Sequence, residues 1–165
     1  ALRKILKFNE KTTDYIEKRK SEMNLPVDYI AVHIRRGDKI VSREMKELGL
    51  SLYIDAVKGK KHISRNVFIA TDDSSVKDEL KSILVAEGFN VYCNTAVTQT
   101  GFDESLFNTK DKKSRYIDTL NMLLDMDILI HSSFFIGTYT SNVSRIVPLY
   151  VGFGKSLSLD DEWKL

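Results

Sequence analysis

The chain has little cysteine, little net charge and no long apolar run, and each shortage excludes a class of function. Cys93 is the one cysteine in 165 residues, which excludes an internal disulfide and a multi-cysteine zinc site. Its setting after Val91 and Tyr92 predicts a buried strand position, so we interpret it as a core residue. Lys plus Arg number 25 against 23 Asp plus Glu, so no overall field recruits nucleic acid or an anionic membrane. Any anion site must come from a local arrangement.

No apolar run approaches the roughly 20 residues that cross a bilayer, and the segment from Ala1 to Lys4 lacks the apolar core of a signal peptide. We therefore expect no transmembrane segment in this chain. The HEXXH, Walker and GxGxxG motifs are also absent, which argues against zinc hydrolases, P-loop NTPases and ordinary NAD-binding domains. With 42% hydrophobic and 29% charged residues, residues 1–165 have the composition of one globular domain.

Short apolar segments alternate with helical patterns along the chain. Strands are predicted at residues 29–34, 66–71, 89–93 and 134–138, and helices at 2–23, around 53–57, and at 76–87, 113–130 and 141–150. The polar connection 94–112 is long enough for a functional loop, and we assign it no structure. The alternation predicts an α/β domain, a Rossmann-like, mostly parallel sheet with helices on both faces.

Polar residues follow three of the predicted strands. The segment from His33 to Lys39 follows the first strand, Asp72 and Asp73 follow the second, and residues 138–142 follow the fourth and open a helix. In open parallel sheets, ligands bind beyond the carboxyl ends of the strands. We therefore expect the three clusters to converge on one edge of the sheet.

Two adjacent arginines, Arg35 and Arg36, come directly after the first strand. Guanidinium groups are costly to bury without a planar anionic partner, and a phosphate is such a partner. Neighbouring side chains of a strand point in opposite directions, so one arginine can face a diphosphate while the other pairs with a carboxylate such as Asp38. A surface Arg-Asp turn is the alternative, and His33 taken alone is more typical of a core histidine.

The acidic and hydroxyl residues also allow two interpretations each. Asp72 and Asp73 suit a ligand hydroxyl, an arginine partner or a metal, but equally a helix N-cap. The hydroxyls of residues 138–142 suit an anion at a helix N-terminus, or serve as a cap alone. Asp125, on an apolar helix, can accept two N–H bonds from a guanine edge, whereas its spacing also fits an exposed helix face.

Taken together, these motifs resemble those of the α1,6-fucosyltransferases and their relatives, the α1,2- and protein O-fucosyltransferases. The family motif His-x-Arg-Arg-x-Asp-Lys is matched by residues 33–39, and an Ala-Thr-Asp-Asp segment by residues 70–73. An aspartate, a Thr-x-(Ser/Thr)-Ser turn and an arginine are matched by Asp125, residues 138–143 and Arg145. Residues 158–161 also look like a family segment, so the resemblance extends over residues 29–161 in the expected order.

The resemblance implies a GT-B architecture of two Rossmann-like halves, of which this chain is similar to the C-terminal, nucleotide-sugar-binding half; an N-terminal GT-B domain is then missing. It implies transfer of fucose from GDP-fucose to a glycan or glycoprotein acceptor with inversion, and with no metal or other cofactor. A transferase for another nucleotide sugar and a non-catalytic nucleotide-binding domain remain alternatives. The family is mostly found in the Golgi or secretory lumen, but the sequon Asn142-Val143-Ser144 lies inside the proposed phosphate turn and leaves a cytoplasmic location open.

The resemblance also implies residue roles. Arg35 would bind the β-phosphate, His33 and Asp125 the nucleoside, and Ser141 with Asn142 a phosphate. The expected nucleotide-sugar-binding set is His33, Arg35, Asp72, Asp73, Asp125, Thr140, Ser141, Asn142 and Arg145. The expected catalytic set is Arg35, Arg36, Asp38, Lys39, Glu44 and Tyr53. This chain departs from the family twice: Asn142 stands where glutamine is usual, and the catalytic glutamate faces Arg43 unless one inserted residue moves Glu44 there.

Overall fold

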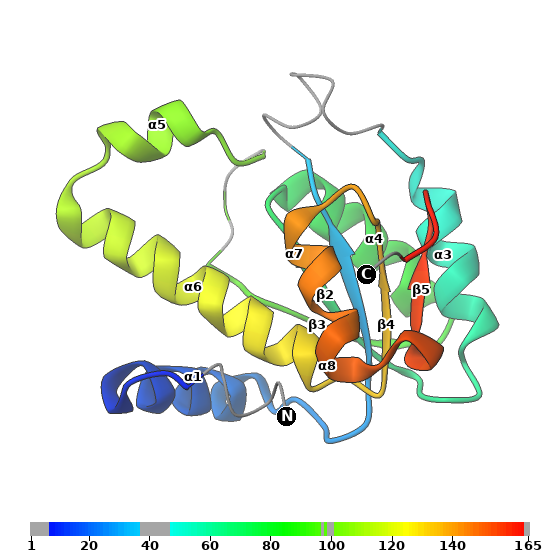
Figure 1. Ribbon diagram of the computed structural model, residues 1–165. Helices are drawn as coiled ribbons and strands as arrows, with labels where there is room; N and C mark the ends of the chain where they lie inside the picture. Colours follow the sequence, from blue (N-terminus) through cyan, green and yellow to red (C-terminus); the bar gives the residue numbers. More distant parts are fainter. Residues whose placement is uncertain (1–6, 37–46, 97, 99–100, 164–165) are drawn as a thin grey trace.

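The computed structural model of the protein describes residues 7–36, 47–96, 98 and 101–163 (Figure 1). The helices are α1 (Glu10–Met23), α3 (Leu50–Gly59), α4 (Ser74–Ala86), α5 (Glu104–Thr109), α6 (Lys112–Ile130), α7 (Asn142–Ile146) and α8 (Pro148–Val151), with a short 3₁₀ turn, η2, at Phe153–Lys155. The strands are β1 (Ile30–Ile34), β2 (Asn66–Thr71), β3 (Asn90–Cys93), β4 (Phe134–Gly137) and β5 (Ser156–Ser158). Among the described residues no helix is both long and apolar enough to cross a membrane.

The five strands form one sheet in the order β3-β2-β1-β4-β5, and every neighbouring pair is parallel. β1 lies at the centre and is buried at all five positions. Its apolar side chains alternate between the two faces, as a parallel strand covered on both sides requires. The predicted Rossmann-like α/β fold is therefore confirmed.

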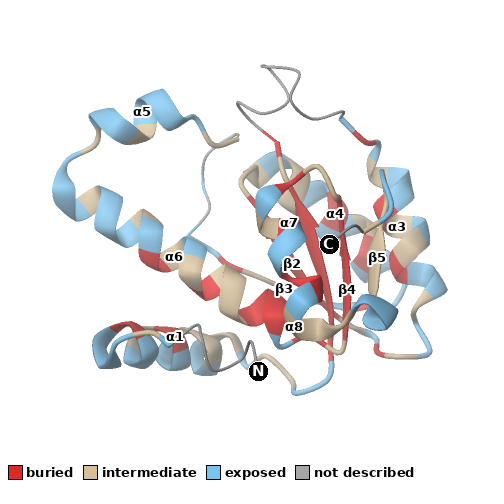
Figure 2. Ribbon diagram, viewed as in Figure 1, coloured by how far each residue is buried: buried red, intermediate tan, exposed pale blue. Residues whose placement is uncertain are grey.

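Each face of the sheet carries its own apolar core. On one face Tyr53 and Val57 of α3 pack with Leu80 and Leu84 of α4. On the other face Ile16 of α1 packs with a row of α6 side chains, Leu124, Ile128 and Leu129. Figure 2 shows that the buried positions of α6 gather in its C-terminal half, while its N-terminal half extends beyond the sheet. That overhanging half supplies one wall of the site described below.

Several elements differ from the sequence-based prediction. The helix expected at residues 141–150 is two short helices, because Pro148 begins α8 and cannot continue α7. The first helix begins at Glu10, capped by Asn9 through a 3.0 Å bond from Thr12 N, and residues 1–6 lie outside the described part of the chain. α5 occupies part of the connection that we left unassigned. β5 was not expected, since three residues carry almost no periodicity.

Cys93 is also placed differently from the prediction. It lies on β3 at the edge of the sheet and is only partly buried. An edge strand is covered less completely than a central one, so the apolar residues before Cys93 do not predict its burial correctly.

Candidate functional site

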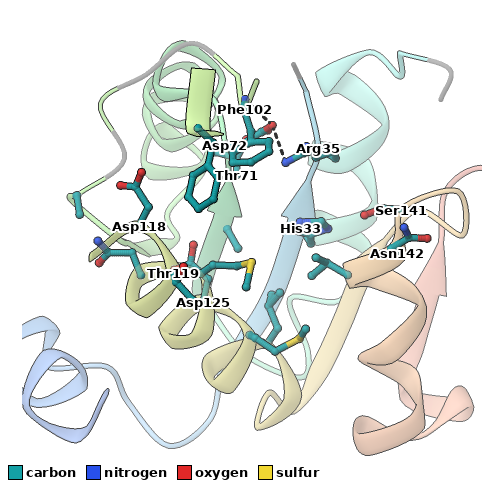
Figure 3. Close-up of a pocket in the computed structure, with 18 of the residues that line it drawn as sticks. His33, Arg35, Thr71, Asp72, Phe102, Asp118, Thr119, Asp125, Ser141 and Asn142 are labelled. Atoms are coloured by element: carbon teal, nitrogen blue, oxygen red, sulfur yellow. Dashed lines mark hydrogen bonds and ion pairs between the residues drawn. The ribbon is translucent and has the colours of Figure 1, made fainter. Parts of the chain in front are cut away.

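A cavity of about 940 Å³ lies at the carboxyl edge of the sheet, between the overhanging half of α6 and the start of α7. β1, β2 and β4 all end at this edge, as the parallel arrangement predicts. Figure 3 shows side chains from these separate segments pointing into one space. Its polar lining includes His33, Arg35, Thr71, Asp72, Lys110, Asp118, Asn121, Asp125, Thr140, Ser141, Asn142 and Arg145.

His33 lies in the floor of the cavity and is almost fully buried. Its Nδ1 is 2.7 Å from Ser144 Oγ, a hydroxyl with no exposed surface. Burial, reinforced by the nearby charge of Arg35, lowers the pKa of His33 to about 3. The ring is therefore neutral at physiological pH, with Nδ1 anchored and the ring held against α7.

Arg35 projects into the cavity and is held on two sides. Its Nη1 lies 3.1 Å from Asp72 Oδ2, and its guanidinium carbon lies 5.0 Å from the centre of the Phe102 ring. Asp72 in turn accepts the backbone N–H groups of Arg36 at 2.7 Å and Phe102 at 3.0 Å. Of the roles considered for Asp72, the structure supports that of arginine partner, and the cluster joins β1, β2 and the loop before α5.

Arg36 faces away from the cavity, on the other side of the sheet edge. Only 8% of the residue is exposed; Nη2 donates to Leu48 O at 2.8 Å, and Nε lies 3.7 Å from Glu47 Oε1. The two arginines thus point in opposite directions, as the strand alternation predicts. Arg36 does not line the cavity. Its contacts hold Glu47 and Leu48, which precede α3, and its expected catalytic role stays a prediction.

Two further residues of the predicted set are also placed outside the cavity. Tyr53 is buried in the core between the sheet and α3, where burial raises its pKa to about 12. Asp73 is the N-cap of α4 and accepts the backbone N–H groups of Ser75 and Val76. The cap interpretation of Asp73 is therefore the one the structure supports. The candidates Asp38, Lys39 and Glu44 lie outside the described residues.

The turn between β4 and α7 is fixed by an acid that we did not predict as a site residue. Asp160 accepts the backbone N–H of Tyr139 at 2.6 Å, the backbone N–H of Thr140 at 3.1 Å and the Thr140 hydroxyl at 2.6 Å. Burial raises the pKa of Asp160, but the hydrogen bonds from Thr140 and from the Ser158 hydroxyl outweigh it, so the pKa is lowered overall. Its signal in the sequence was its place in residues 158–161, which resemble a family segment.

The residues predicted to bind phosphate at this turn differ in how far they are exposed. Ser141 is buried at the cavity wall and caps α7 without a side-chain hydrogen bond. Asn142 and Arg145 are exposed and line the cavity. Arg145 is positioned by Tyr139, with Nε 2.8 Å from the Tyr139 carbonyl oxygen and the guanidinium 4.6 Å from its ring centre. A second cation therefore lies at the cavity rim.

Asp125 lies on α6 at the opposite wall, where it is partly buried and lines the cavity (Figure 3), so it does not lie on an exposed helix face. Burial raises its pKa to about 7, while a hydrogen bond from Asn94 Nδ2 at 3.3 Å acts in the opposite direction. Asn94, Phe102 and Asp118 were not predicted, because they come from the unassigned connection and from a helix position without a motif. The described residues include no cluster of three or more His, Cys, Asp or Glu side chains arranged to hold a metal ion.

Comparison with known proteins supplies the family. The family model for alpha-(1,6)-fucosyltransferase N- and catalytic domains matches residues 1–149. A crystal structure of NodZ alpha-1,6-fucosyltransferase with GDP is similar at a TM-score of 0.58 and 21% identity, over 88% of this chain and 43% of that one. NodZ from Bradyrhizobium, in another crystal structure, is similar at 0.56 and 22% identity over the same shares.

POFUT1 in complex with GDP-fucose is similar at a TM-score of 0.60 and 15% identity, over 97% of this chain and 48% of that one. The chain thus spans less than half the length of these solved structures, and at such identities they show a common fold. No curated protein matches the chain in sequence. Since the family model covers residues 1–149 of 165, the protein belongs to the alpha-(1,6)-fucosyltransferase family.

Proposed function

We propose that the cavity binds GDP-fucose, and that the enzyme to which this domain belongs transfers fucose to a glycan or glycoprotein acceptor with inversion. One observation carries the proposal. His33, Arg35, Asp125 and Ser141, drawn from three separate segments of the chain, line a single cavity at the carboxyl edge of the sheet. The solved structures of NodZ with GDP and of POFUT1 with GDP-fucose share this fold, which supports the choice of nucleotide.

The arrangement suggests how the donor lies. Arg35 and the turn at Ser141 and Asn142 provide a guanidinium fork, a hydroxyl and backbone N–H groups, which together suit a diphosphate. Asp125, on the opposite wall, suits the guanine edge, because an ionised carboxylate accepts from N1–H and the N2 amino group together. The neutral His33 between them contacts the nucleoside without adding charge.

The reaction is a displacement at the anomeric carbon of fucose. An acceptor hydroxyl oxygen forms a bond to that carbon as the bond to the diphosphate oxygen breaks, GDP leaves with the bonding electrons, and the hydroxyl proton passes to a base. Arg35 and the N–H groups of the turn stabilise the charge that grows on the diphosphate; loss of one such contact typically costs about 2.7–4 kcal/mol of barrier. Glu44 is our candidate for the base.

Isothermal titration calorimetry with GDP, UDP and ADP tests the donor assignment. We expect GDP to bind more tightly than UDP or ADP, and equal affinity for GDP and UDP would contradict it. Transfer from a panel of GDP-sugars and UDP-sugars, with and without EDTA, then separates fucose from other donors; we expect fucose transfer to survive EDTA. GDP binding without turnover in the complete protein would favour the non-catalytic alternative.

A further inference from the structure

Asn94 is a buried amide that touches the pocket wall without being part of the predicted site. It directly follows β3, and only 2% of its surface is exposed. Its Nδ2 donates to Asp125 Oδ1 and to Asn121 Oδ1, each at 3.3 Å. Among the described residues, no other hydrogen bond reaches the Asp125 carboxylate.

The orientation of the Asn94 amide is determined by its other contacts. Its Oδ1 accepts the backbone N–H of Ala96 at 3.1 Å, and a backbone N–H can only donate. The amino group must therefore face α6. There Asn121 presents its oxygen, because its own amino group donates to Ile117 O at 3.1 Å and its oxygen also accepts the Tyr15 hydroxyl at 3.0 Å. The network thus runs from α1 through α6 to Asp125.

We propose that Asn94 is a positioning residue that fixes the Asp125 carboxylate for two simultaneous hydrogen bonds to guanine, and so sets the base preference of the pocket. This inference rests on the proposed binding of a guanosine diphosphate. Two parallel N–H donors require both carboxylate oxygens in the plane of the base, and rotation of the carboxylate breaks one bond. A donor held at Oδ1 restrains that rotation, and it leaves a second lone pair on the same oxygen for the ligand.

The same contact also acts on the charge of the carboxylate. Partial burial on α6 favours the neutral acid, whereas the Asn94 amino group favours the ionised form. A neutral acid carries a proton on one oxygen and cannot accept both guanine N–H groups. Asn94 therefore promotes the guanine contact through geometry and through charge.

The test compares nucleotides that differ by one group. Inosine diphosphate lacks the 2-amino group of GDP, so the ratio of their dissociation constants reports the second hydrogen bond. A hydrogen bond to a charged group contributes about 1.5–3 kcal/mol, so we expect the wild-type protein to prefer GDP by about tenfold or more. Asn94→Asp is nearly isosteric and still accepts from Ala96, but it presents an acceptor to Asp125. We expect it to bring the ratio close to one.

Asn90→Asp is the matched control, since it makes the same change on the exposed start of the same strand; we expect it to keep the wild-type ratio. Asn94→Ser repeats the test without adding a charge. It removes the donor to Asp125, because the serine hydroxyl is too short to reach that carboxylate. In an Asp125→Asn background, Asn94→Asp should leave the ratio unchanged, because Asn94 then has no carboxylate to position.

The outcomes separate this inference from the proposed function. A wild-type protein without preference for GDP over UDP would refute the proposed donor and this inference with it. A clear GDP preference that survives in Asn94→Asp and Asn94→Ser would overturn only the role of Asn94. Equal weakening of GDP, inosine diphosphate and UDP, accompanied by a lower melting temperature, would show a structural role and would also overturn it.

Discussion

Arg35 Nη1 lies 3.1 Å from Asp72 Oδ2, and the same oxygen accepts the backbone N–H of Phe102 at 3.0 Å. The candidate phosphate-binding arginine is therefore an ion-pair residue as well. The two side chains are only 21% and 11% exposed, so the pair is shielded from water. Because Asp72 also accepts the backbone N–H of Arg36, the acid keeps two partners when the arginine is removed.

Replacing Arg35 by alanine should impair binding much more than folding. The free energy of unfolding should fall by about 1 kcal/mol, well below the 3–5 kcal/mol of a buried charge left without a partner. The rise in melting temperature that GDP produces should disappear, because the ligand no longer stabilises the native state. Arg35→Lys should also lose most GDP binding, since it keeps the charge but not the planar fork. Melting curves with and without GDP measure both effects.

Lys58→Ala is the control for Arg35, because Lys58 pairs with Glu87 at 2.9 Å on an exposed surface. It should leave both the melting temperature and the GDP response unchanged. A loss of 3 kcal/mol or more in the ligand-free Arg35→Ala protein would make Arg35 primarily structural.

Gly137, the last residue of β4, allows α7 to approach the sheet. A Cβ at this position would lie 2.6 Å from Phe135 Cζ and 2.7 Å from Ser144 Oγ, the hydroxyl that bonds His33. Gly137→Ala should therefore destabilise the protein by about 1–3 kcal/mol, as overpacking does. Gly59→Ala, where a Cβ meets nothing within 4 Å, should be neutral or slightly stabilising. Urea unfolding of the two variants tests the pair.

The sequence predicted the fold well because its strands are short apolar runs bounded by turn residues. The predicted strand 66–71 has the same bounds as β2. Because ligand sites lie at the carboxyl ends of parallel strands, His33, Arg35 and Ser141 were expected at one edge of the sheet, and all three line the cavity there. The side of the sheet on which a residue lies was harder to predict. Tyr53 belongs to a core that only the packing of α3 reveals, since periodicity shows that a face is apolar and not which neighbour covers it.

The contacts of the site were less predictable than its location. Asp160 reaches Thr140 across 20 positions of the chain, and Asn94 reaches Asp125 across 31. Such bonds depend on the placement of β5 and on the end of β3, both of which lack a strong local pattern. Helix caps were easier, because the acid of a cap precedes its N–H donors by two or three residues, as Asp73 does.

Asp160 should affect the affinity for GDP although it does not line the cavity. Asp160→Asn removes the charge that holds the Tyr139 and Thr140 amides and the Thr140 hydroxyl. We expect GDP affinity to fall by about tenfold, because the turn that presents Ser141 loses its anchor and one charge-assisted bond contributes about 1.5–3 kcal/mol. Asp161→Asn, the same change at the exposed neighbour, should leave GDP affinity unchanged. Calorimetry of both variants decides, and equal losses would point to a general charge effect.

The Asp125 carboxyl should make the ligand-free protein less stable as pH rises. Burial raises its pKa in the folded protein from the usual 3.8 to about 7, so the unfolded chain releases this proton more readily. The protonated Asp125 carboxyl therefore contributes to the free energy of unfolding fully below about pH 4, and this contribution is lost as pH rises through about 7. Asp125→Asn should therefore stabilise the protein more at pH 8 than at pH 5, by about 2 kcal/mol. Urea unfolding at the two pH values measures this, and an equal effect at both would contradict the burial of the acid.

GDP affinity should show the opposite trend with pH, because the ligand needs the ionised form of Asp125. Below about pH 7 the acid takes up a proton, and GDP binding should weaken as pH falls from 8 to 6. His33 remains neutral over this range, since its pKa is about 3. The terminal phosphate of the nucleotide also takes up a proton near pH 6, so UDP, which carries the same diphosphate, is titrated in parallel. A fall in GDP affinity that exceeds the fall for UDP, and that disappears in Asp125→Asn, would assign the guanine contact to Asp125; parallel curves for the two nucleotides would refute it.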